Sequence, residues 1–144
     1  MKETICTVLG LVFGYISSLF SGWDAAISTL VCFMAMDYIT GLIVAGVFHK
    51  SGKTESGALE SSVGWRGLCR KGMTLAVVLV ACRLDMVIGS NLLRDAAVIA
   101  FVANETISIV ENVGLMGVPV PPVIVQAIEV LKKKSELDNK KDGD

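Results

Sequence analysis

The sequence predicts an all-α integral membrane protein, a bundle of four transmembrane helices followed by a short cytoplasmic amphipathic helix. Hydrophobic residues make up 53% of its 144 residues and charged residues only 19%, with a mean hydropathy of +0.64, whereas soluble domains carry about a quarter charged residues. Apolar stretches of membrane-spanning length recur, and several hold charged side chains near the middle. Charged groups at that depth are costly and generally serve function. The net charge of −1 argues against a nucleic-acid partner.

The first predicted span, Ile5 to Phe20, is the shortest, and three crossings are the alternative if it does not span. Lys2 is followed by Glu3, and the residues after the span lack a small-residue cleavage pattern, which favours a retained helix over a signal peptide. Small residues recur four apart on one face: Gly10, Gly14 and Ser18. Such a face lets another helix backbone approach closely, and chance spacing is the alternative interpretation.

The second and third predicted spans both contain charge. The second runs from Ala25 to about Phe48, with Asp37 near its centre and Gly41 one turn further on the same face. We expect Gly41 to pack against another helix. The third runs from about Met73 to Gly89, and its charged residues are Arg83 and Asp85.

The fourth predicted span, from about Leu93 to Gly117, is amphipathic for a membrane helix. Its polar residues form a stripe about two turns long: Asn104, Glu105, Ser108, Glu111 and Asn112. Such a stripe can line a pore, or it can join helices through hydrogen bonds between them. Helical spacing alone does not separate these two interpretations.

Depth within the membrane follows from the helical rise. At about 1.5 Å per residue, Asp37 and Glu105 come roughly 18 Å from the outer ends of their helices, and Arg83 and Asp85 roughly 15 to 20 Å from the cytoplasmic end of theirs. All four are therefore predicted to share one layer near the midplane, with Arg83 paired to Asp37 or Glu105. One cation does not neutralise three carboxylates, which favours an assembly or a water-filled lumen. A structural ion-pair network is the alternative.

The distribution of basic residues predicts the orientation. Five basic residues lie between the second and third spans: Lys50, Lys53, Arg66, Arg70 and Lys71. Five more lie in the tail: Lys132, Lys133, Lys134, Lys140 and Lys141. Basic loops stay in the cytoplasm, so four crossings with both termini cytoplasmic satisfy the rule. We expect Arg66, Arg70 and Lys71 to lie at the membrane interface near anionic headgroups, with a simple flank that stops translocation as the alternative.

The transmembrane domain is predicted to cover residues 1–118 and the cytoplasmic tail residues 119–144. Three prolines end the membrane region: Pro119, Pro121 and Pro122. Residues Val123 to Lys134 then predict the amphipathic helix, with four apolar residues on one face: Ile124, Ala127, Ile128 and Leu131. The last ten residues are expected to be disordered.

The sequence lacks the motifs that are typical of catalytic or cofactor-binding sites. It contains no phosphate-binding glycine loop and no protease or hydrolase motif, and its single histidine has no partner for nucleophilic catalysis. The four cysteines lack metal-ligand spacing. We therefore expect neither an enzyme nor a cofactor.

Four motifs occur in a fixed order, MDYITG at 36–41, GLCRK at 67–71, NETISIVEN at 104–112 and GVPVP at 117–121. In these motifs the chain resembles the bacteriophage holins of the group that includes the clostridial toxin-secretion holins, over roughly residues 25–134. The first span matches this group only loosely.

The resemblance implies a protein of the bacterial cytoplasmic membrane that associates with itself and with lipids. It implies timed lesions through which an endolysin or a toxin passes without specific binding. On that interpretation the polar residues of the membrane spans line a pore or hold the assembly together. The alternatives are a small proton-coupled multidrug or ion transporter, in which one midplane carboxylate binds protons and cations in turn, and an antiholin regulator.

Overall fold

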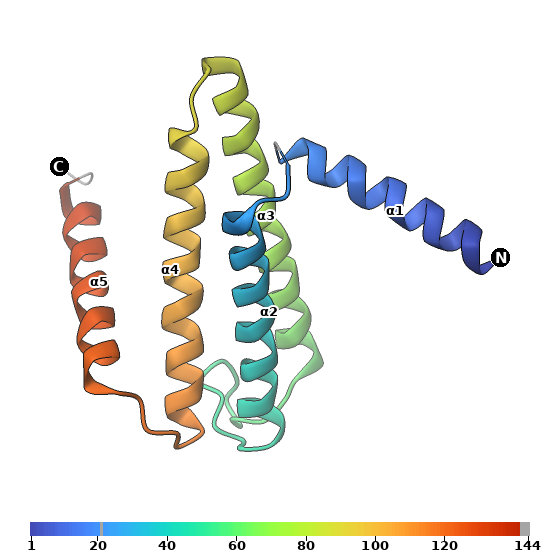
Figure 1. Cartoon of the computed structure of the whole chain (residues 1–144). Coiled ribbons are helices and arrows are strands. Elements are labelled where there is room, and N and C mark those ends of the chain that lie inside the picture. Colours follow the sequence, from blue (N-terminus) through green and yellow to red (C-terminus); the bar gives the residue numbers. More distant parts are fainter. Residues whose placement is uncertain (21, 142–144) are drawn as a thin grey trace.

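Within residues 1–20 and 22–141, which the computed structural model describes, the chain folds entirely into α-helices and the segments that connect them (Figure 1). The helices are α1 (Lys2–Leu19), α2 (Ala25–Gly46), α3 (Ser61–Ile88), α4 (Leu92–Leu115) and α5 (Pro122–Lys141). The predicted all-α class is confirmed. Three of these helices, α1, α2 and α4, are long and apolar enough to cross a membrane.

The helix α3 differs from the predicted third span. It begins at Ser61 instead of Met73 and has 28 residues, which corresponds to about 42 Å at about 1.5 Å per residue. It is also more polar, since the stretch from Lys71 to Ile88 alone carries three charged side chains. For that reason it does not qualify as a span by composition alone, and the predicted count of four crossings is not confirmed.

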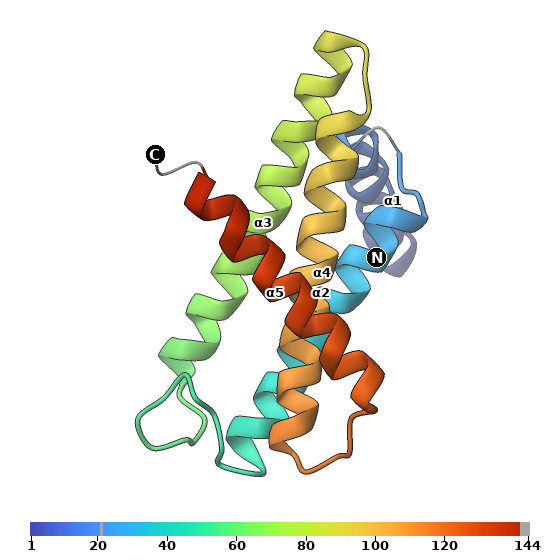
Figure 2. The ribbon, with the colours of Figure 1, turned by 90° about the vertical axis from the view of Figure 1, so that its left-hand side faces the viewer.

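The core lies among α2, α3 and α4, which run side by side in both views (Figures 1 and 2). The helix α4 packs along α2 and, less extensively, along α3. One cluster of buried apolar residues joins all three helices and the end of α1: Phe20, Ile27, Leu30, Met34, Val78, Cys82 and Val98. Most other large apolar side chains face outward, as expected for a surface in contact with lipid.

The connector between α2 and α3, residues 47–60, is folded into hydrogen-bonded turns. The amide of Lys50 donates to the carbonyl of Val44 at 3.1 Å, and the amide of Ser51 donates to the carbonyl of Gly57 at 3.0 Å. Gly57 has a φ of 72°, and a Cβ there would lie 2.3 Å from the carbonyl oxygen of His49. Only glycine fits this turn.

The helix α1 leaves the bundle (Figure 1) and has no buried residue. Within the described residues, no atom lies within 4 Å of an added Cβ at Gly10 or Gly14, and the hydroxyl of Ser18 donates to the carbonyl of Tyr15 in the same helix. The predicted small-residue face therefore makes no close helix contact within the protomer, and its packing against another copy stays a prediction.

The helix α5 is longer than the predicted amphipathic helix. It runs to Lys141, so the expected disorder of the last ten residues is wrong up to that point, and residues 142–144 lie outside the described part of the chain. Figure 1 shows α5 beside α4, and Figure 2 shows it crossing α4 obliquely. Of the predicted apolar face, Ile128 is buried, Ile124 and Ala127 are exposed, and the side chain of Leu131 is outside the described set.

A buried polar cluster as the candidate functional site

Lys71 joins the three core helices through two ion pairs. Its Nζ, on α3, lies 2.8 Å from Oδ2 of Asp37 on α2 and 2.5 Å from Oε2 of Glu105 on α4. The Lys71 side chain is 15% exposed and each carboxylate side chain 8%. One ammonium group thus pairs with two carboxylates inside apolar helices, and the fully ionised cluster carries one excess negative charge.

Asn112 on α4 extends this cluster toward the next turn of α2. Its Nδ2 lies 3.1 Å from Oδ1 of Asp37, 3.3 Å from the Asp37 carbonyl oxygen and 3.0 Å from the hydroxyl oxygen of Thr40. Gly41 faces the same amide, since a Cβ there would lie 3.7 Å from Nδ2. The polar groups of α2 and α4 therefore satisfy one another at a close approach of the two helices.

Arg83 does not make the predicted ion pair. It is exposed, and its Nη1 contacts the sulfur of Met86 at 3.4 Å. Lys71, which the sequence placed at the membrane interface, occupies the position expected for Arg83. Twelve residues separate them, roughly 18 Å along a helix, and the error arose because α3 begins well before Met73.

A sequence signal for Lys71 becomes visible once the helix ends are known. Asp37 lies nine residues before Gly46, Lys71 ten residues after Ser61, and Glu105 ten residues before Leu115. These helix ends lie at the same end of the bundle (Figure 1). Equal distances from one end place the three charges in one layer.

Asp85 also lies outside the predicted midplane layer. It is fourteen residues from Lys71, about 21 Å along α3, at the opposite end of the bundle. Its carboxylate accepts hydrogen bonds from the hydroxyl of Ser90 at 2.7 Å and from the amides of Leu93 at 3.2 Å and Arg94 at 2.8 Å. Asp85 therefore caps the N-terminus of α4, where negative charge is favoured by the helix dipole.

Arg94 is a buried residue that is not among the predicted site residues. Its guanidinium pairs with Asp24 and, at 3.0 Å, with Asp95. Asp24 in turn caps α2, because its Oδ1 accepts from the amide of Ile27 at 3.0 Å. This hydrogen bond, aided by Arg94 and opposed by partial burial, holds the pKa of Asp24 below its usual value of 3.8. The pair ties the starts of α2 and α4 together.

The remaining residues of the predicted stripe on α4 fall into two groups, one inside the bundle and one exposed. Ser108 lies beside the carboxylate of Asp37, so it belongs to the buried cluster. Asn104 is exposed. Glu111 is exposed on the wall of a cavity. The stripe is therefore partly internal to the bundle and partly outside it.

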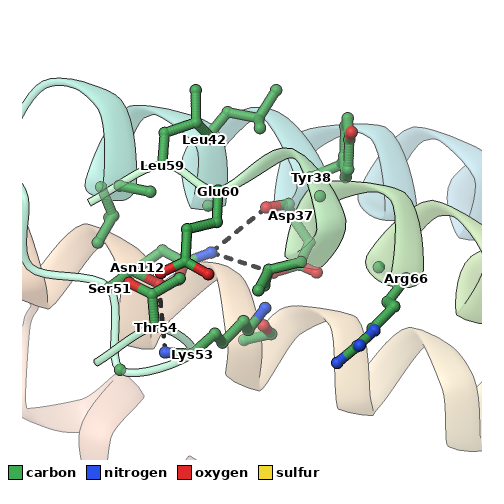
Figure 3. A pocket seen from close by; sticks show the side chains of 18 of the residues that line it. Asp37, Tyr38, Leu42, Ser51, Lys53, Thr54, Leu59, Glu60, Arg66 and Asn112 are labelled. Atoms are coloured by element: carbon green, nitrogen blue, oxygen red, sulfur yellow. Dashed lines mark hydrogen bonds between the residues drawn. The ribbon is translucent and has the colours of Figure 1, made fainter. Parts of the chain in front are cut away.

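The cavity has a volume of about 540 Å³ and lies between the connector and the ends of α2, α3 and α4 (Figure 3). Asp37 and Lys71 form its polar floor. Its wall also includes the predicted interfacial residues Arg66 and Arg70, together with Lys53 of the connector. Among the described residues, no group of three metal-ligating side chains gathers, and all four cysteines are unbridged.

Comparison with known proteins identifies relatives over most of the chain. A model of the bacteriophage holin family matches residues 14–133. The chain is 38% identical over 133 residues to uncharacterized protein Lmo0128 of Listeria monocytogenes serovar 1/2a, covering 92% of this chain and 87% of that protein. It is 36% identical over 137 residues to uncharacterized protein CPE0383 of Clostridium perfringens strain 13, covering 92% and 96%.

A phage protein is also similar. The chain is 34% identical over 108 residues to the probable holin of Bacillus phage phi105, and the match covers 74% of each chain. No solved structure matches the chain.

Proposed function

Since this chain belongs to the bacteriophage holin family, we propose that it oligomerises in the bacterial cytoplasmic membrane and forms timed lesions that release endolysin or a toxin. It is a membrane protein of a non-enzymatic family. Both termini lie in the cytoplasm on this proposal, because the basic connector and the basic tail then stay on one side. The cargo passes through the lesion without specific binding.

The buried cluster of Lys71, Asp37 and Glu105 is the observation that carries the proposal. Charged groups inside membrane helices are stable only if they are paired, hydrogen-bonded or in contact with water. In the compact bundle the cluster is paired internally, so the protomer presents an apolar surface to lipid. This bundle corresponds to the closed state.

An open state exposes the same groups to water. Separation of α2, α3 and α4 breaks the ion pairs, and a water-filled lumen formed by several copies hydrates the released charges. Hydration removes much of the desolvation cost that burial imposes on an uncompensated carboxylate. The excess negative charge of the cluster favours this step, because one carboxylate shares its cation.

Accumulation of protein sets the time of opening. An assembly that exists only at high protein density gains population by mass action, while the isolated bundle dominates at low density. A delay before opening follows, because the assembly stays rare until synthesis has filled the membrane.

The experiment that tests this function is induced expression in a bacterium that carries a cytoplasmic endolysin without an export signal. Turbidity and membrane potential are recorded together. We expect abrupt depolarisation after a delay, and lysis only when the endolysin is present. Steady growth with intact potential indicates the antiholin instead, and a graded leak of ions without lysis indicates the transporter; both results overturn the proposal.

Two variants sharpen this experiment. Lys71→Met leaves Asp37 and Glu105 without their cation, so we expect a shifted onset of depolarisation in cells that contain equal amounts of inserted protein. Arg83→Met removes a basic side chain from the same helix at an exposed position and serves as the matched control, with an onset close to that of the parent protein.

A further inference from the structure

The cavity at the basic end of the bundle is lined by three basic residues outside the ion-paired cluster, Lys53, Arg66 and Arg70. Among the side chains that the structure describes, none lies within hydrogen-bond or ion-pair distance of theirs, and Lys53 acts electrostatically on Asp37 from further away. Arg66 and Arg70 are one helical turn apart and share a face of α3. Figure 3 shows Lys53 and Arg66 approaching from opposite sides. These three exposed cations form the mouth of the cavity.

The cavity also offers hydrogen-bond acceptors. Asp37, which pairs with Lys71, lies on its floor and is 6% exposed, and the exposed residues Glu60 and Glu111 lie on its wall. The hydroxyl of Tyr38 faces α3 at Gly64 and has no hydrogen bond within the described chain. A ligand that fits must therefore carry a negative group at the mouth and hydrogen-bond donors further in.

Apolar groups continue from the mouth onto the outer surface. Leu59 and Leu115 line the cavity and are partly exposed, and Trp65, 66% exposed, stands next to Arg66. Tryptophan beside basic residues is typical of the level of the lipid headgroups. The cavity volume of about 540 Å³ lies within the range of roughly 300 to 1,000 Å³ that small-molecule sites occupy.

We propose that this cavity binds the headgroup of one phospholipid whose phosphodiester is held by Lys53, Arg66 and Arg70 and whose glycerol or ethanolamine group donates hydrogen bonds to the inner carboxylates. Arginine suits the phosphate because its planar guanidinium forms two parallel hydrogen bonds. The acyl chains leave past Leu59 and Leu115. This inference rests on the membrane insertion proposed above and does not require lesion formation.

The headgroup links two helices and the connector between them. It contacts α2 through the cavity floor, α3 through its two arginines and the connector through Lys53. A bound lipid therefore stabilises the compact bundle by mass action.

The test uses the full chain purified in detergent and native mass spectrometry to count bound lipid. Phosphatidylglycerol, phosphatidylethanolamine and phosphatidylcholine are added in turn at equal concentration. The first two carry a hydrogen-bond donor and the third does not, so we expect one bound molecule of either donor lipid and about tenfold weaker binding of phosphatidylcholine, the change that one charge-assisted hydrogen bond produces. Equal binding of all three overturns the proposal.

Variants locate the site. Arg66→Gln and Arg70→Gln remove the phosphate contacts, and each is expected to weaken binding of phosphatidylglycerol about tenfold. Arg70→Lys keeps the positive charge but lacks the planar guanidinium. Its affinity for phosphatidylglycerol should lie between that of the parent chain and that of Arg70→Gln. The control Arg83→Gln changes an exposed arginine at the other end of α3. If it lowers binding as much as Arg66→Gln, the lipid is attracted only by overall charge and the site assignment is wrong.

A soluble phosphate source is tested separately. Glycerol 3-phosphate, which has no acyl chains, is added as a competitor to the lipid complex. We expect no displacement at equal concentration, because the apolar rim does not hold it. Displacement at equal concentration shows that the cavity takes a free phosphate ester and overturns the lipid assignment. Normal lysis by a variant that has lost lipid binding leaves the proposed function intact, so the two proposals fail independently.

Discussion

The ammonium group of Lys71 and the carboxylate of Glu105 lie 2.5 Å apart, although 34 residues separate them in the sequence. The same ammonium contacts Asp37, 34 residues earlier, at 2.8 Å. These two contacts bind α3 to both of its neighbours at one level. They are strong polar links among the core helices, because buried charge-assisted hydrogen bonds are stronger than neutral ones.

Replacement of Lys71 by methionine is expected to destabilise the bundle strongly. Two buried carboxylates lose their cation, and removal of one partner from a buried ion pair costs about 3 to 5 kcal/mol. The free energy of unfolding in detergent, followed by the loss of helical signal, measures the effect. The triple change Lys71→Met, Asp37→Asn and Glu105→Gln removes the charges together, and it should recover most of the loss. If the triple variant is as unstable as Lys71→Met, the charge imbalance is not the cause.

Replacement of Asn112 by alanine should cost about 1 to 3 kcal/mol of unfolding free energy, because the buried carboxylate of Asp37 loses a hydrogen-bond donor. The backbone carbonyl of Asp37 and the hydroxyl of Thr40 also lose the Asn112 amide but keep the hydrogen bond between them. Asn104→Ala is the matched control, because Asn104 is exposed on the same helix; its change should stay within about 0.5 kcal/mol. Equal losses in the two variants contradict the assigned role of Asn112.

Replacement of Asp85 by alanine should loosen the α3–α4 turn. The amides of Leu93 and Arg94 lose their acceptor, and loss of a helix cap costs about 0.5 to 2 kcal/mol. Asp85→Asn keeps one acceptor oxygen and loses the charge, so its stability should lie between that of the parent chain and that of Asp85→Ala. Amide hydrogen exchange at residues 92–95 gives a local measurement, and unchanged exchange in the alanine variant contradicts the capping role.

The stability of the start of α2 should depend on pH through Asp24. Its pKa is lower in the folded chain than the usual 3.8, first because of the hydrogen bond from Ile27 and also because of Arg94. The ionised form therefore stabilises the fold above pH 3.8, and this contribution is lost as the pH falls through the lower folded value. The difference in Tm between the parent chain and Asp24→Asn should be positive at pH 6 and shrink toward zero in acid. A Tm difference that grows as the pH falls contradicts this role of the ionised Asp24.

Bulky residues on α1 should affect association and leave the protomer intact. A Cβ added at Gly10 or Gly14 meets no described atom within 4 Å, so we expect Gly10→Leu and Gly14→Leu to leave the unfolding free energy of the monomeric bundle unchanged. If this face packs against a second copy, leucine prevents the close approach of the two backbones. Cross-linking through the exposed Cys6 measures association, and unchanged cross-linking of both variants contradicts the predicted packing face.

The helical class and the burial of Asp37 and Glu105 could be predicted from the sequence, because apolar length and the cost of intramembrane charge act locally along the chain. The cation that pairs with these two carboxylates could not be predicted from the sequence. Hydropathy locates where a helix becomes apolar, and α3 begins a dozen residues before that point. A helix start misplaced by three turns moved the predicted cation from Lys71 to Arg83.

Asp85 and Arg94 show a second limit of sequence reasoning. A carboxylate within an apolar stretch is predicted to lie near the membrane midplane. Asp85 instead caps the helix that follows. This contact depends on the tight turn at Gly89, whose φ is 77°. Arg94 belongs to none of the predicted polar groups. Its burial depends on Asp24, 70 residues away, and no local pattern encodes that distance.

The equal spacing of the three cluster residues also bears on biosynthesis. The chain is made from its N-terminus, so Asp37 is followed after 34 residues by Lys71 and after 34 more by Glu105. A charged residue at the centre of a lone helix adds about 2.5 to 3.5 kcal/mol to its insertion free energy. If α2 and α3 enter the bilayer together as a hairpin, Asp37 and Lys71 enter as a neutral pair, which lowers this cost for both. On that route the polar helix α3 depends on the helix made before it, and α4 completes the cluster last.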